Sequence, residues 1–209
     1  MWSVEHGVFG AAVSQLGFHQ RWGARTTALF IVASLLPDVD SVTLFFGREA
    51  YFSYHRGLTH TLGAAVLGAA LLAALFCAAR GHLPPTSRGE KPREEQSDHA
   101  VRQPAGWRAG GPADGGAWRE FGLFFGIGLL AIMGHLLADT LYPWPIPIFW
   151  PLSSRKLAFD VLGWGDGGIR NWTIVTMLAL AVLRRHRRAV ALFSLAALAL
   201  YIGWRFQLS

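Results

Sequence analysis

The chain has few charged residues and a single cysteine. Charged residues account for 15% of its 209 residues and hydrophobic residues for 52%, whereas an average soluble domain has about 25% charged residues. This shortfall, together with several long apolar runs, predicts an integral membrane protein. The single cysteine, Cys77, lies within an apolar run. It excludes a disulfide framework within one chain, and we expect it to be an inert core residue.

Signatures of several enzyme classes are also absent. There is no Gly-x-Ser-x-Gly elbow to support a serine nucleophile, no Walker loop and no cysteine-based metal motif. The N-terminus lacks a basic stretch followed by a short apolar core and a cleavage site, so we expect the first apolar segment to be retained. A formal net charge of +6 could indicate nucleic-acid binding. The basic residues, however, cluster in loops between apolar runs, and we predict no nucleic-acid partner.

Six apolar segments are present, and each predicts a helix. One of them, 58–79, has about the length needed to cross the hydrocarbon core of a bilayer. The fold class that we predict is all-α, a polytopic membrane bundle of about six hydrophobic helices that forms a single domain over residues 1–209. The predicted helices cover residues 4–18, 26–36, 58–79, 121–141, 172–183 and 189–206.

The connections between these segments differ in character. Pro37 disfavours helical geometry at the residue before it, so we expect the second helix to end at Leu36 and residues 41–54 to form an aromatic-rich connection. Residues 80–119 are rich in Gly, Pro, Arg and Glu, a composition that predicts a long disordered loop. Residues 142–151 are rich in proline and aromatic residues, which predicts a rigid loop at the membrane interface.

The distribution of basic residues predicts an orientation in the membrane. Six antiparallel crossings place the basic run 184–188 and the segment 80–119 on the same side, which the positive-inside rule makes cytoplasmic. Seven residues of metal-binding types then all fall on the opposite side, although the topology was assigned without them. We therefore predict one metal site on the extracytoplasmic side. Its candidate ligands are His6, Asp38, Asp40, His55, His60, His135 and Asp139.

The spacing of two pairs favours metal binding. His135 and Asp139 lie four residues apart on a predicted helix and so share a face. Asp38 and Asp40 lie two apart, and in an extended segment both carboxylates could point the same way and bridge two cations. The alternative for the first pair is hydrogen bonding between helices, and for the second pair it is a solvated turn.

A third pair, His55 and His60, flanks an arginine and a glycine. If Gly57 changes the chain direction, both imidazoles can converge on one site. Arg56 suits a phosphate or carboxylate group and is our candidate catalytic residue. The alternative is that these side chains snorkel to the membrane interface.

The whole set is larger than one metal site requires. Four histidines and three aspartates exceed the ligands of one tetrahedral zinc site. They fit one or two divalent ions with an open position, an arrangement that lowers the pKa of bound water and polarises a phosphoryl or acyl oxygen. Zinc is our first choice, and mixed His and Asp ligation also suits manganese or iron.

Four motifs occur in a fixed order, LLPDVD (35–40), HRGLTH (55–60), GHLLAD (134–139) and WPLS (150–153), after the early His6. In these motifs the chain resembles the YdjM-like bacterial inner-membrane proteins, a family of membrane-bound metal-dependent hydrolases. The resemblance covers most of residues 1–156 except the long loop. It implies an all-helical, multi-pass protein of the bacterial inner membrane with a His/Asp metal site and hydrolase activity. The site chemistry is also similar to that of the helical zinc phospholipases.

Three hypotheses about function follow. The first is a membrane-bound metal-dependent hydrolase that activates water at a His/Asp site, with a lipid or lipid-linked phosphoester as substrate because the site lies at the membrane surface. The second is a non-catalytic membrane protein that binds or transports metal ions, which the almost wholly apolar last two helices disfavour. The third is a structural protein in which these polar residues pair across helices.

Overall fold

The computed structural model describes residues 3–79 and 116–209. The predicted disordered loop, 80–119, therefore lies largely outside the described residues. Its last four residues contradict the prediction, because residues 116–119 form the first turn of a long helix. This helix begins five residues before the predicted start at 121.

Most of the described residues are helical, and no strand forms among them. A single antiparallel bridge pairs Ile146 with Leu157. The α-helices are α1 (Ser3–Ser14), α2 (Phe18–Trp22), α3 (Ala24–Leu35), α4 (Arg48–Tyr54), α5 (Leu62–Ala78), α6 (Gly116–Asp139), α7 (Gly167–Val182) and α8 (Arg187–Leu208). Three 3₁₀ segments separate some of them, η1 (Leu36–Phe46), η2 (Leu58–His60) and η4 (Arg184–His186).

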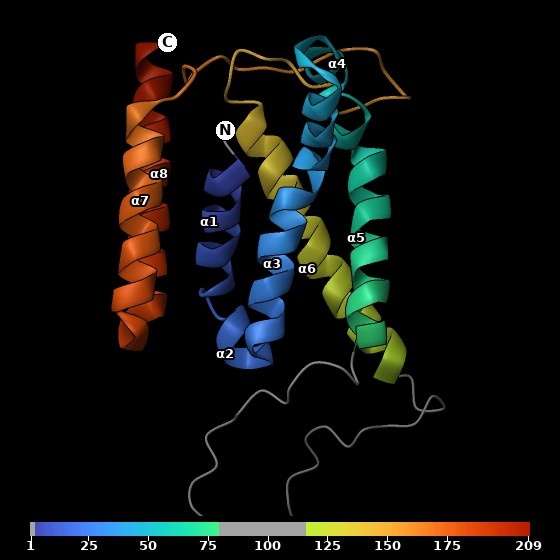
Figure 1. Ribbon diagram of the computed structural model, residues 1–209. Coiled ribbons are helices and arrows are strands. Elements are labelled where there is room, and N and C mark those ends of the chain that lie inside the picture. Colours follow the sequence, from blue (N-terminus) through green and yellow to red (C-terminus); the bar gives the residue numbers. More distant parts are fainter. Residues whose placement is uncertain (1–2, 80–115) are drawn as a thin grey trace, which may run out of the picture.

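The long helices lie side by side and define two ends of the bundle (Figure 1). The upper end carries α4 and the connection 140–166, and the lower end carries α2 and the turn between α7 and α8. Helices α3, α5 and α6 share one apolar core that includes Leu29, Phe30, Ala69 and Ile132. Helices α7 and α8 form a pair on the other side of α1.

The six predicted membrane crossings are not confirmed. Among the described residues, three segments could span a membrane by length and composition, namely Ala24–Phe46, Gly116–Asp139 and Arg184–Leu208. A bent pair, Arg48–His60 and Leu62–Ala78, joined at an angle of 74°, would be a fourth. Helices α1 and α7 have 12 and 16 residues, fewer than the roughly 20 that a perpendicular crossing needs.

The α-helix α3 ends at Leu35, within one residue of the predicted end at Leu36, but the segment after it differs from the prediction. A 3₁₀ segment, η1, begins directly after α3, and α4 follows, so residues 41–54 are mostly helical. Pro37 occupies the first turn of η1, where its missing N–H would lack a helical partner in any case. As a result, Asp38 and Asp40 lie on a 3₁₀ turn and not on the extended segment that we expected.

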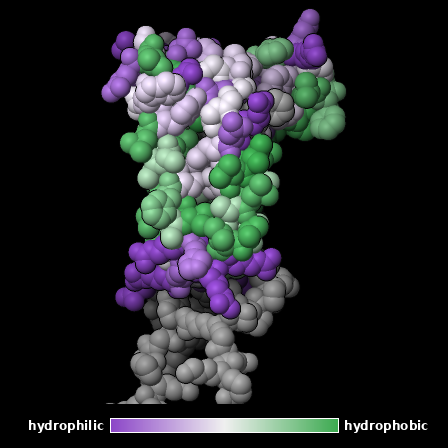
Figure 2. Space-filling model, turned by 90° about the vertical axis from the view of Figure 1, so that its left-hand side faces the viewer, coloured by the Kyte–Doolittle hydropathy of each residue, from purple (hydrophilic) through white to green (hydrophobic). Residues whose placement is uncertain are grey.

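The outer face of α7 and α8 is apolar. Figure 2 shows a hydrophobic band on this side of the molecule, above a hydrophilic belt at the lower end. Exposed apolar side chains here include Val175, Leu178, Phe193 and Leu200. An exposed surface of this kind suits the hydrocarbon of a bilayer. Cys77 is partly buried and packs against the main core.

Candidate metal centre

The predicted site residues meet at the upper end of the bundle. They come from four places in the fold, the α1 helix, η1, the segment from the end of α4 through η2, and the last two turns of α6. None is more than 9% exposed. The set comprises His6, Asp38, Asp40, His55, Arg56, His60, His135 and Asp139.

Four of these residues point one side-chain atom each at a common centre. His60 Nε2 lies 3.3 Å from His135 Nε2 and 3.2 Å from Asp139 Oδ2. His135 Nε2 lies 3.5 Å from the same Asp139 oxygen. Asp38 Oδ1 completes the group at 3.7 Å from His60 Nε2 and 3.6 Å from His135 Nε2. We call these four residues the inner cluster.

These separations match the edges of a coordination tetrahedron. With zinc bonds of 2.0–2.1 Å, two tetrahedral ligand atoms lie about 3.3 Å apart. The five separations given above run from 3.2 to 3.7 Å. A small divalent ion would therefore fit with little movement of the side chains.

The hydrogen bonds around the two histidines direct lone pairs at this centre. His135 Nδ1 lies 2.7 Å from the carbonyl oxygen of Ser34, so this nitrogen is the donor and Nε2 is free to coordinate. Thr59 Oγ1 donates to Asp40 Oδ2 (2.6 Å) and therefore accepts from His60 Nδ1 (3.0 Å). Two nitrogen lone pairs thus face two carboxylates, an arrangement that a cation stabilises.

A second group of possible ligands adjoins the first. Asp38, Asp40 and His55 each offer an atom within 4.8 Å of the others, so Asp38 belongs to both groups. Asp40 accepts hydrogen bonds from His55 Nδ1 (2.7 Å) and from the Arg56 main-chain N–H (3.1 Å) as well as from Thr59. Tyr51 stacks on the His55 ring at 4.5 Å. Asp40 therefore orients the loop that presents His60.

His6 lies beside the inner cluster. Its ring stacks on His135 with a centroid separation of 3.7 Å, and its Nε2 lies 3.3 Å from Asp139 Oδ1. The other nitrogen, Nδ1, is buried and has no hydrogen-bond partner among the described residues. His6 is not one of the four convergent ligands.

Arg56 faces inward. Its guanidinium donates to Asp139 Oδ1 (2.8 Å) and to the Trp144 carbonyl (3.1 Å), and it lies 5.6 Å from the ring centre of Trp164. Arg56 also carries the unusual backbone of the turn, with a φ of 60°. The expected change of direction therefore falls at Arg56, one residue before Gly57. Gly57 itself has no room for a side chain, because an added Cβ would lie 2.8 Å from the Tyr54 carbonyl oxygen.

A pocket of about 450 Å³ opens next to the site. Asp38 and His55 line it, together with Glu5, Tyr142 and Trp164. Burial, and after it the carboxylate of Glu5, raises the pKa of the Tyr142 phenol well above its usual range. The phenol is protonated at neutral pH, so Tyr142 adds a neutral group to the lining of the pocket.

Sequence reasoning missed two residues that hold the histidines in place. Thr59 links His60 to Asp40, and its position inside the HRGLTH segment was the available signal. Ser34 acts through its main-chain carbonyl, and a main-chain contact leaves no signal in residue type.

Fold and site together define an all-helical protein with a buried His/Asp cluster at one end of helices long and apolar enough to cross a membrane. The chain matches the family model described as YdjM inner membrane protein over residues 1–208, and it belongs to that family. The predicted resemblance is confirmed, and it covers the whole chain and not only residues 1–156. The family also supports the predicted inner-membrane location. No curated protein and no solved structure matches the chain.

Proposed function

We propose that the protein is a membrane-bound metal-dependent hydrolase. The observation that carries the proposal is the inner cluster, in which His60, His135, Asp38 and Asp139 direct one atom each at a common centre. Buried carboxylates are costly unless they are paired or bind metal. The arrangement of two histidine lone pairs and two carboxylates fits zinc best, and manganese or iron are alternatives.

A divalent ion held at this site would lower the pKa of water and polarise a phosphoryl or acyl oxygen. The surrounding residues would keep the ligands in place. Thr59 and the Ser34 carbonyl fix the imidazoles of His60 and His135, and Arg56 holds Asp139 Oδ1 so that Oδ2 faces the centre. Arg56 would thus position a ligand, in addition to any contact with an anionic substrate group.

Asp40 and His55 extend the proposal to a second ion. Asp38 belongs to both groups of possible ligands, so its carboxylate could bridge two ions. The adjoining pocket is large enough for a headgroup. Exposed aromatic and apolar residues at the same end, including Phe45 and Leu152, support a lipid or lipid-linked phosphoester as substrate.

The first test is the metal content of detergent-purified protein. Wild-type protein should carry one or two equivalents of zinc, manganese or iron by mass spectrometry, and Asp139→Ala should carry less than a tenth of that amount. Asp160→Asn serves as the matched control, because Asp160 is exposed and lies on the connection before α7. Wild-type protein without metal, even after reconstitution with zinc, would refute the proposal.

Activity is the second test. Metal-loaded wild-type protein should hydrolyse phospholipids or phosphoester analogues, and Asp139→Ala should not. Metal uptake into proteoliposomes without any hydrolysis would favour the alternative, a transport protein. A lower thermal stability of His135→Ala that is independent of metal would favour a structural role.

A further inference from the structure

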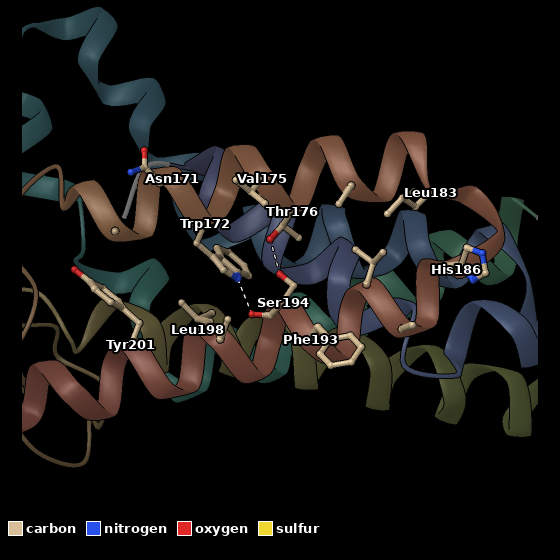
Figure 3. A pocket seen from close by; sticks show the side chains of 15 residues that line it. Asn171, Trp172, Val175, Thr176, Leu183, His186, Phe193, Ser194, Leu198 and Tyr201 are labelled. Atoms are coloured by element: carbon tan, nitrogen blue, oxygen red, sulfur yellow. Dashed lines mark hydrogen bonds between the residues drawn. The ribbon is translucent and has the colours of Figure 1, made fainter.

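A long apolar groove lies between α7 and α8, away from the metal centre. Its volume is about 690 Å³, and all its lining residues belong to these two helices and the turn that joins them. Figure 3 shows the groove running from Asn171 and Tyr201 at one end to His186 at the other. The groove therefore extends along most of the length of α7.

Few polar contacts hold the two helices together along this groove. Trp172 Nε1 donates to the Ser194 carbonyl (2.8 Å), and the hydroxyl groups of Thr176 and Ser194 share a hydrogen bond. Beyond these contacts the walls are mainly apolar, with Val175, Ala179 and Phe193 among them. In a bilayer such a groove would be filled by hydrocarbon, because its apolar walls offer almost nothing to hold water.

The lower end of the groove is strongly basic. His186 and Leu183 line the groove, and four arginines occupy the same turn. Two of them, Arg184 and Arg187, use Nε to bind the carbonyls of Ala181 (3.3 Å) and Leu180 (3.0 Å). Within the described part of the chain, none of the four arginines forms an ion pair with a carboxylate. The charge at the mouth of the groove is therefore not neutralised by described residues.

We propose that the hairpin of α7 and α8 binds one anionic phospholipid, with its headgroup at the basic turn and an acyl chain in the groove. Basic pockets between helices near a membrane surface bind anionic headgroups. One half of a bilayer is about 15 Å thick, and α7, with its 16 residues, is about 24 Å long. The groove is thus long enough for one chain. It is walled by the two helices of a single hairpin, which suits a thin chain better than a helix from a second copy.

The test compares two lipids that differ only in headgroup charge. Native mass spectrometry or calorimetry on purified protein should show tighter binding of phosphatidylglycerol than of phosphatidylcholine with the same acyl chains. Replacing Arg185 and Arg188 by Gln should weaken phosphatidylglycerol binding by about 25-fold, about fivefold for each arginine, and reduce the preference by the same factor. The control is Arg48→Gln with Arg155→Gln, two exposed residues at the upper end.

A second pair of variants tests the groove itself. Ala179→Phe places a large side chain in the groove and should weaken binding of both lipids equally. Ala199→Phe, at an exposed position of α8 outside the groove, should leave binding unchanged. If Ala179→Phe fails to fold, Ala197→Leu, which also lines the groove, replaces it.

Three results would overturn the proposal. They are equal binding of the two lipids by wild-type protein, an undiminished preference in the double arginine variant, and a dimer that forms through the groove and that Ala179→Phe dissociates. None of these readouts depends on the metal centre, so the proposal and the proposed function can fail separately.

Discussion

At the scale of single residues, the metal centre depends on which nitrogen of each histidine carries the proton. Thr59 determines this for His60, because its hydroxyl is already donated to Asp40. Outer partners of this kind orient metal-bound histidines, and their loss typically costs 10–100-fold in metal affinity. Thr59 is therefore a positioning residue, although its hydroxyl faces away from the common centre.

Replacing Thr59 by Val removes the hydroxyl and keeps the shape of the side chain. We expect Thr59→Val to weaken zinc binding by roughly 10–100-fold, measured by competition with a chelator of known affinity. Thr59→Ser, which keeps the hydroxyl, should bind zinc nearly as tightly as wild type. Zinc binding by Thr59→Val at wild-type strength would show that another group fixes His60.

Arg56 provides a second prediction at this scale. Arg56 and Asp139 form a buried ion pair with both partners at most 3% exposed. Removing one partner of such a pair costs about 3–5 kcal/mol, because the remaining charge is left uncompensated. Arg56→Met should therefore lower the melting temperature in detergent, and the loss should be larger in EDTA than in zinc, since the ion also compensates Asp139.

The control for this substitution is Arg48→Met. Arg48 is exposed at the start of α4, and surface substitutions usually change stability by less than about 0.5 kcal/mol. Equal melting temperatures for the two variants would mean that Arg56 serves the substrate and not Asp139. In that case the Michaelis constant for an anionic substrate should rise instead.

At the scale of elements, the site depends on how closely α1 approaches α3. A side chain added at Gly10 would come within 2.7 Å of the Phe30 carbonyl oxygen and even closer to Ser34 Oγ. The same stretch of α3 supplies the Ser34 carbonyl that holds His135, and α1 carries His6. The absence of a side chain at Gly10 therefore sets the distance between two parts of the site.

We expect Gly10→Ala to destabilise the protein by about 1–3 kcal/mol, the usual cost of overpacking, and to weaken metal binding as α1 moves outward. Thermal unfolding and the chelator competition would measure the two effects. Gly126→Ala on α6 is the matched control, because nothing lies within 4 Å of the added atom. Its stability should stay the same or rise slightly, since Ala favours a helix over Gly. Equal effects of the two substitutions would contradict the role of this contact.

At the scale of the whole molecule, the two ends of the bundle differ in charge and chemistry. The lower end carries the arginine-rich turn between α7 and α8, and the upper end carries the site. The positive-inside rule predicts that the lower end faces the cytoplasm. A site at the upper end would then face the extracytoplasmic side.

Single cysteines can test this orientation in a Cys77→Ala background. A membrane-impermeant maleimide added to intact cells should label Ser154→Cys at the upper end and leave His186→Cys at the lower end unlabelled. Both positions are exposed. The opposite pattern would place the site in the cytoplasm, and labelling of both cysteines only after lysis would show that the reagent reaches neither end in intact cells.

Much of the site could be predicted from sequence because it is built from residue types that are rare in apolar helices. His135 and Asp139 stand out on α6 for this reason, and HRGLTH stands out at the start of a long apolar run. The role that each of these residues takes in the site could not be predicted. Asp38 joins the inner cluster and Asp40 orients a loop, although the two differ by only two positions.

Residue types and their order are enough to predict that the chain is helical, that it carries long apolar segments, and that its polar residues of metal-binding type gather at one end. Composition and periodicity decide these features, because burial of apolar surface acts on every residue in the same way. The folded structure was needed to show that a 3₁₀ segment follows α3, that Arg56 turns inward to Asp139, and that the α7 and α8 helices leave a groove between them. These features depend on contacts between residues far apart in the chain, and such contacts leave no periodic signal in the sequence.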